Sequence, residues 1–241
     1  MWRRGVAWVL SSKLKKIAVE KRSRVVLALD YYPHGRDPLD FWSSLLSDVG
    51  DLVAGVKVGL PALLSVGTEG LRELVESFSG DVYFIADFKL ADIEDIVRSV
   101  ALSVLGMGFN GAILHLFPLC YSRLGVREGG RSLDLYGVAS MSCPSTLMDA
   151  HLDELLDYAA KLGLAGVVVG ANKPHAIRRA RERLGSQALI LSPGVGVQGV
   201  EPGAAIAAGA DFEIVGRAVV ASPSPRAALE RIVKSHPPPG W

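Results

Sequence analysis

The sequence predicts an α/β fold, a (β/α)8 TIM barrel with a short basic N-terminal extension, and three observations lead to this prediction. The chain has 241 residues, a normal length for one such barrel. Eight apolar runs of strand type recur along the chain, and helical patterns separate most of them. Continuous Val, Ile and Leu strands that alternate with amphipathic helices indicate parallel strands that are buried on both faces.

The predicted strands share a short apolar core of four to seven residues: 25–29, 52–58, 82–86, 111–115, 135–139, 166–169, 188–191 and 212–215. The predicted helices show amphipathic spacing: 39–47, 70–78, 92–106, 152–162, 174–184, 201–208 and 224–234. The fourth connection, 119–130, has a weaker helical pattern. An open doubly wound sheet is the structural alternative, but no Gly-x-Gly-x-x-Gly follows the first strand.

The chain divides into a basic arm or extra helix at 1–24, a catalytic barrel at 25–235 and a tail at 236–241. The arm holds eight lysines and arginines and one acid, Glu20, and we expect it on the bottom of the fold. Its apolar run 6–10 is too short for a signal-peptide core. We therefore expect a cytoplasmic protein.

The net charge of +1 gives no reason to expect a nucleic-acid partner, and no apolar run reaches membrane-spanning length. Cys120 and Cys143 form no Cys-x-x-Cys pair and no metal-ligand pattern. We expect each cysteine to behave as a small hydrophobic residue in a reducing compartment. No metal or cofactor site is evident in the sequence.

The third predicted strand ends in Asp87-Phe88-Lys89, and Asp92 follows where the next helical pattern begins. Residues i and i+2 of an extended segment point to the same side, so Asp87 and Lys89 face one way. Asp92 is predicted as a helix N-cap, where a carboxylate suits the free N–H groups and the dipole. Catalytic residues of barrels lie at such strand ends.

Other strand ends add further polar groups. Asp30 ends strand 1, Lys57 lies between two valines near the end of strand 2, and His115 ends strand 4. A lysine within a buried strand needs a carboxylate partner, because desolvation of an unpaired charge is costly. His115 is interpreted as a core or rim histidine rather than a ligand. The lysines and aspartates of three adjacent strands therefore predict one functional network.

Two glycine-containing segments predict a phosphate site. Pro193-Gly194-Val195-Gly196-Val197-Gln198-Gly199 follows strand 7, and Gly216-Arg217 follows strand 8. Barrels often bind phosphate with these two loops, through backbone N–H groups and a helix N-terminus. Arg217 can add a bidentate contact and Gln198 an amide donor.

With these residues assembled, the chain resembles the orotidine 5′-phosphate decarboxylases, in particular the archaeal single-domain type. The resemblance runs from about Val25 to the last helix. Its signatures are Asp-Phe-Lys-Leu-Ala-Asp-Ile at 87–93, Pro-Gly-Val-Gly-Val-Gln-Gly at 193–199 and Val-Gly-Arg at 215–217. The sequence departs from the family pattern at Ile96, where the family often has a Thr that contributes to the partner's site.

The resemblance implies decarboxylation of orotidine 5′-phosphate to uridine 5′-phosphate in de novo pyrimidine biosynthesis, with no cofactor. Asp87 would lie against the substrate carboxylate, and Lys57 would bridge Asp87 and a ribose hydroxyl. Lys89 would protonate pyrimidine C6 as carbon dioxide leaves. Asp92 would reach into the neighbouring subunit's site, which implies a homodimer.

The resemblance also implies the substrate-binding residues. Asp30 would contact the ribose, and Ser142, after strand 5, would bond the pyrimidine ring. The phosphate end would be formed by residues of the two glycine-containing segments: Pro193, Gln198, Gly216 and Arg217.

Two other readings stay open. Metal-dependent relatives, the hexulose-phosphate synthases and sugar-acid phosphate decarboxylases, resemble the Asp-x-Lys-x-x-Asp stretch but use it around Mg²⁺. They typically carry Glu after strand 2, and Lys57 argues against them because a lysine would repel a divalent ion. A non-catalytic phosphate-binding barrel is the second alternative, but this reading leaves Lys57 and Asp87 without a function.

Overall fold

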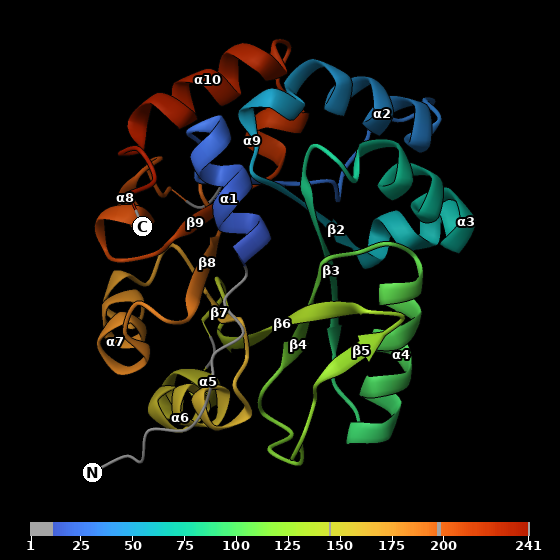
Figure 1. The fold of residues 1–241 in the computed structure, drawn as a ribbon. Coiled ribbons are helices and arrows are strands. Elements are labelled where there is room, and N and C mark those ends of the chain that lie inside the picture. Colours follow the sequence, from blue (N-terminus) through green and yellow to red (C-terminus); the bar gives the residue numbers. More distant parts are fainter. Residues whose placement is uncertain (1–11, 145, 197–198, 241) are drawn as a thin grey trace.

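The computed structural model describes residues 12–144, 146–196 and 199–240, and it contains a closed barrel of eight parallel strands with helices outside (Figure 1). Around the barrel the strand order is β1, β2, β3, β4, β6, β7, β8 and β9, and β9 pairs with β1. The pairing of β4 with β6 completes the ring. The predicted (β/α)8 barrel is therefore confirmed.

The strands have the following bounds: β1 Val25–Ala28, β2 Gly55–Gly59, β3 Tyr83–Leu90, β4 Gly111–His115, β5 Val126–Glu128, β6 Arg131–Ser140, β7 Gly166–Val169, β8 Leu189–Pro193 and β9 Phe212–Val215. Every residue of β1, β2, β7 and β9 is buried. Burial on both faces explains why these strands read as continuous apolar runs rather than as alternating ones.

The helices have the following bounds: α1 Ser12–Lys21, α2 Pro38–Val49, α3 Leu60–Phe78, α4 Glu94–Gly106, α5 Thr146–Ala150, α6 Leu152–Leu162, α7 Pro174–Leu184, α8 Ala204–Ala207, α9 Arg217–Val220 and α10 Pro225–Ser235. A 3-10 turn, Gly50–Leu52, follows α2. The helices bury one face against the strands; α2, for example, starts at the N-cap Asp37 and buries Trp42, Leu45 and Val49.

The helix α1 covers the N-terminal end of the barrel and lies across the ring of strands in Figure 1. Its apolar face, Leu14, Ile17 and Ala18, is buried. Lys13 donates to the Ser79 carbonyl and Lys21 to the Gly50 carbonyl, and both carbonyls precede barrel strands. The basic segment thus closes the bottom of the barrel with a helix at 12–21, while 1–11 lie outside the described residues.

The fourth connection contains no helix, so the helical pattern assigned to 119–130 was misleading. The segment instead supplies β5, which pairs antiparallel with β6 and registers Glu128 against Arg131. Gly129 and Gly130 have φ values of 57° and 76°, which a two-residue type I′ hairpin turn requires at both central positions. The Gly-Gly pair was the signal for this hairpin.

The predicted N-cap at Asp92 is also wrong. The helix α4 begins at Glu94, and its N-cap is Ile93 in an extended conformation. The Asp92 carboxylate accepts a hydrogen bond from the Ile93 N–H at 2.7 Å, before the helix starts. Glu94 and Asp95 supply the negative charge that favours the first helical turn.

We expected each cysteine to behave as a small hydrophobic residue, but Cys120 and Cys143 are exposed free thiols. In the part of the chain that the structure describes, no helix is both long enough and apolar enough to cross a membrane. The cytoplasmic location and the domain bounds stay predictions.

Candidate active site

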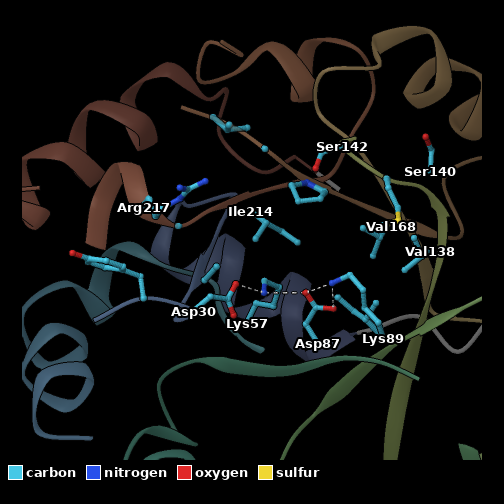
Figure 2. Close-up of a pocket in the computed structure, with 18 residues that line it drawn as sticks. Asp30, Lys57, Asp87, Lys89, Val138, Ser140, Ser142, Val168, Ile214 and Arg217 are labelled. Atoms are coloured by element: carbon cyan, nitrogen blue, oxygen red, sulfur yellow. Dashed lines mark hydrogen bonds and ion pairs between the residues drawn. The ribbon is translucent and has the colours of Figure 1, made fainter. Parts of the chain in front are cut away.

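A cavity of about 390 Å³ opens at the carboxyl ends of the barrel strands (Figure 2). This volume is in the range of small-molecule sites. Eight of the ten predicted site residues line the cavity: Asp30, Lys57, Asp87, Lys89, Ser142, Pro193, Gly216 and Arg217. The structure therefore brings together side chains that come from strands spread over most of the chain.

Four of these side chains form a row of alternating charge, which Figure 2 shows along one side of the cavity. Lys57 Nζ lies 2.7 Å from Asp30 Oδ2 and 2.9 Å from Asp87 Oδ2. Lys89 Nζ lies 2.8 Å from Asp87 Oδ1. The aspartates thus alternate with the lysines, as the strand-end positions predicted.

Strand register explains how Lys57 reaches both carboxylates. Lys57 pairs with Ala28 of β1 and with Ile85 of β3, and each lies two residues before an aspartate. The long lysine side chain extends toward the carboxyl ends of its neighbours and meets both aspartates. One lysine on the middle strand therefore joins three adjacent strand ends.

Burial and charge oppose each other in this row. Lys57 is 5% exposed, and burial alone would lower its pKa, but the carboxylates of Asp87 and Asp30 outweigh burial and raise the pKa. Burial would raise the pKa of Asp87, but Lys57 and Lys89 together lower it. The network therefore holds Lys57 and Asp87 ionised in a site largely closed to water.

Lys89 has an unusual backbone conformation. Its φ of 44° lies in the left-handed region, which costs a residue with a side chain roughly 1–3 kcal/mol. The pairing of β3 with β4 shifts register between Ala86 and Leu90, so the strand is irregular at this point. Strained backbone of this kind is concentrated at functional sites, and here it accompanies the ammonium group that faces the cavity.

The remaining wall of the cavity is largely apolar, and sequence reasoning missed most of it. It includes these residues near strand ends that the sequence analysis did not single out: Ala28, Tyr31, Ile113, Val138, Ser140, Met141, Val168 and Ile214. Ser142, which was predicted, lies across the view from the charged row in Figure 2. The available signal was position, because inward-facing residues near the carboxyl end of a barrel strand line its mouth.

The predicted phosphate end is formed by the start of the loop after β8 and by the start of α9. Gly194 and Gly196 have φ values of 111° and 82°, which favour glycine. A Cβ at Gly196 would lie 2.7 Å from the Ala218 Cβ, so the loop packs closely on α9. Pro193, Gly216 and Arg217 line the cavity at this end, whereas Gln198 lies outside the described residues.

Two polar residues near the cavity do not line it. Asp92 is exposed, and it is absent from the cavity wall. His115 is half-buried, its Nδ1 has no partner among the described groups, and burial and Lys89 lower its pKa.

Within the described ranges, no three His, Cys, Asp or Glu side chains gather in a way that suits a metal ion.

Comparison with known proteins connects this geometry to a family. A sequence model of the orotidine 5′-phosphate decarboxylase / HUMPS family matches residues 23–232. The chain belongs to this family. The match covers all the barrel strands, including the charged row and the two segments of the predicted phosphate end.

Relatives within the family are similar over nearly their full length. The orotidine 5′-phosphate decarboxylase of Aeropyrum pernix is 42% identical over 223 residues, which are 89% of this chain and 89% of the relative. The enzyme of Pyrococcus horikoshii is 35% identical over 86% of this chain and 96% of its own.

Solved structures agree with this assignment. The crystal structure of orotidine 5′-monophosphate decarboxylase from Sulfolobus solfataricus has a TM-score of 0.71 and 34% identity, covering 88% of this chain and 96% of that one. The enzyme from Methanocaldococcus jannaschii, solved in complex with the inhibitor BMP, has a TM-score of 0.72 and 26% identity, covering 88% and 98%.

Proposed function

We propose that this chain decarboxylates orotidine 5′-phosphate to uridine 5′-phosphate in de novo pyrimidine biosynthesis. Membership of the family and the names of the similar archaeal enzymes support this activity. The observation that carries it is the charged row Asp30–Lys57–Asp87–Lys89 at the mouth of the barrel, in which the two central side chains are buried. Such a row contributes less to stability than apolar packing would, so its presence calls for a chemical role.

The proposed reaction breaks the bond between pyrimidine C6 and the carboxylate carbon. The electron pair stays on C6 while carbon dioxide leaves, and the Lys89 ammonium then transfers a proton to C6. The ammonium is fixed 2.8 Å from Asp87 Oδ1, so it is oriented before the carbanion develops. Asp87 lies against the substrate carboxylate and disfavours the charged ground state in this scheme.

The other cavity residues receive binding roles in the same proposal. Asp30 and Lys57 contact the ribose hydroxyls, and Ser142 bonds the pyrimidine ring. Arg217 holds the phosphate together with Gln198, beside Pro193 and Gly216. Contacts to the phosphate, remote from the reacting bond, supply binding energy that the chemical step can use.

The position of Lys57 distinguishes this reaction from that of the metal-dependent relatives. Its ammonium lies between the Asp30 and Asp87 carboxylates, within 2.7 and 2.9 Å. A divalent cation drawn to the same carboxylates would meet this positive charge at close range. We therefore assign the chain to the cofactor-free decarboxylases.

A homodimer completes the proposed site, with Asp92 entering the partner's cavity. Its support is a set of large apolar side chains that are exposed on α3, at the start of α4 next to Asp92 in the chain, and after β4: Leu60, Leu64, Ile93, Ile96, Phe117 and Leu119. In Figure 1, α3 and α4 lie next to each other on the outside of the barrel. Exposed apolar patches of this kind mark protein–protein interfaces.

The test is the ultraviolet absorbance of orotidine 5′-phosphate mixed with purified protein and excess EDTA. Absorbance decay at a rate proportional to protein concentration is the expected result. The Lys89→Ala variant is expected to lose turnover while it still binds uridine 5′-phosphate. No decay with EDTA, together with activity on a sugar phosphate after Mg²⁺ is added, would move the chain to the metal-dependent relatives.

A further inference from the structure

A second buried lysine lies beside the cavity, in the turn that follows β7. Lys173 is 9% exposed, and its Nζ lies 2.7 Å from both Oδ1 and Oδ2 of Asp149 in α5. The same Nζ donates to the Cys143 carbonyl at 3.1 Å. The proposed reaction gives neither Lys173 nor Asp149 a role, and neither residue lines the cavity.

The partners of this ion pair lie in the segment 140–143, which carries Ser142. The Ser140 hydroxyl donates to Asp149 Oδ1 at 3.0 Å, and Asn172 Nδ2 donates to the Ser142 carbonyl at 2.8 Å. The backbone approaches closely as well, because a Cβ at Gly170 would lie only 2.8 Å from the Ser142 Cα. The turn 170–173 therefore holds the segment 140–143 by side-chain and backbone contacts together.

The same turn also contacts the phosphate end, since the Ala171 N–H donates to the Pro193 carbonyl at 2.9 Å. It thus lies between the segment that carries Ser142 and the loop that begins at Pro193. A change in the turn would alter the spacing between the groups assigned to the base and those assigned to the phosphate.

We propose that Lys173 and Asp149 are positioning residues that fix Ser142 for recognition of the pyrimidine base. The inference rests on the proposed function, because it takes the ligand to be a pyrimidine nucleotide. The pair acts through Ser140 and Cys143, which flank Ser142 in the chain, rather than on the substrate. Only Lys173 of this pair is buried, since the Asp149 side chain is 36% exposed. A buried ammonium group needs its acceptors, and it specifies one geometry when its hydrogen bonds are satisfied.

The test compares two ligands that differ in the base. Uridine 5′-phosphate and ribose 5-phosphate share the sugar and the phosphate, and calorimetry measures the Kd of each for the wild type and the variants. In Lys173→Met we expect uridine 5′-phosphate to bind about tenfold more weakly, since one hydrogen-bonded charged pair is lost. Ribose 5-phosphate should bind as it does to the wild type.

Three further variants separate positioning from stability. Lys173→Met/Asp149→Leu removes both charges of the pair, so no carboxylate is left without its cation; it should fold, yet it should show the same selective loss. Arg181→Met breaks the ion pair of Arg181 with Asp211 away from the cavity, and it should change neither Kd. Lys173→Arg keeps the charge and should retain most of the affinity for uridine 5′-phosphate.

Equal losses for both ligands, or recovery in the double variant, would overturn the inference and leave a purely structural pair. A wild type that binds uridine 5′-phosphate no better than ribose 5-phosphate would also overturn it. Failure of the proposed function is distinguishable, because a wild type that binds uridine 5′-phosphate selectively but does not decarboxylate orotidine 5′-phosphate contradicts only the reaction.

Discussion

Replacement of Lys57 by Met tests whether the charged row is held together by this one lysine. Methionine has nearly the same length and volume and is unbranched, so the variant removes the charge with little change in packing. The side chain of Asp87 is 9% exposed, and it would keep Lys89 as its cationic partner. The Asp30 side chain is 40% exposed and would turn to water.

The expected loss follows from these exposures. Removal of one partner from a buried ion pair costs about 3–5 kcal/mol, because the other charge is left in a site closed to water. In Lys57→Met, Asp87 keeps its contact with Lys89, and Asp30 is exposed to water. We therefore expect a loss of unfolding free energy near the lower end of this range, at about 3 kcal/mol. The double variant Lys57→Met/Asp87→Asn removes the stranded charge and should recover most of this loss.

The loss also depends on pH in a defined direction. In the wild type the pKa of Asp87 is lowered from 3.8, so its stabilising contribution is present above that pH and is lost as the pH falls through the lowered value. In Lys57→Met the pKa of Asp87 rises, because the carboxylate has lost one of its two cations. Protonation therefore removes the buried negative charge of the variant at a higher pH than in the wild type. The difference in unfolding free energy should therefore shrink between about pH 7 and about pH 4.

Urea unfolding of the wild type, the single variant and the double variant at both pH values is the assay. A loss below about 0.5 kcal/mol near pH 7 would refute the reasoning, since that is the range of ordinary surface substitutions. An equal loss at both pH values would show that the cost comes from packing and not from Asp87.

Three further outcomes test other parts of the molecule. Arg217→Ala should raise KM for orotidine 5′-phosphate far more than it changes binding of the uncharged nucleoside uridine; an unchanged KM would remove Arg217 from the phosphate site. The Asp92→Asn variant should be nearly inactive alone. Mixing it with Lys89→Ala should restore about one quarter of wild-type activity, because each hybrid dimer contains one intact site. No recovery after subunit exchange would contradict the shared site. Hydrogen bonds from the Ser122 backbone and hydroxyl lower the pKa of Glu94 from 4.5 to about 2. The Glu94→Gln variant should therefore be less stable than the wild type at neutral pH. Thermal unfolding should show this difference in stability disappearing as the pH falls from 4.5 toward 2.

The charged row could be predicted from sequence because parallel-barrel geometry is general. Once the strands are recognised, their carboxyl ends meet at one rim, and Asp30, Lys57 and Asp87 follow from position alone. No knowledge of loop conformation is needed, because register within a barrel fixes which strand ends are neighbours. The apolar residues Val138, Val168 and Ile214 obey the same rule, but an apolar residue at a strand end has no chemical feature that distinguishes it from a core residue.

Features that depend on loop conformation could not be predicted in this way. Lys173 and Asp149 are separated by 24 positions and lie in different connections, and neither connection has a periodic pattern that places one near the other. The strand β5 has three residues, and only Val126 is buried, so it has no apolar run to detect. Asp92 was assigned to a cap because aspartate is common there, but its carboxylate is engaged by the Ile93 N–H before the helix begins.

Lys57 and Lys173 solve the same physical problem on two sides of the cavity. Each starts from one strand or the turn after it, and each reaches acceptors that belong to a neighbouring strand end or connection. A lysine can do this because its four-carbon side chain spans the gap between strands while its ammonium satisfies several acceptors at once. Desolvation makes the loss of these acceptors costly for each buried ammonium group, so the strand ends and connections that it joins cannot shift without losing an ion pair. The wall that is assigned to the base and the wall that is assigned to the reacting carboxylate are thus each fixed by one buried lysine, and their separation is set by the barrel.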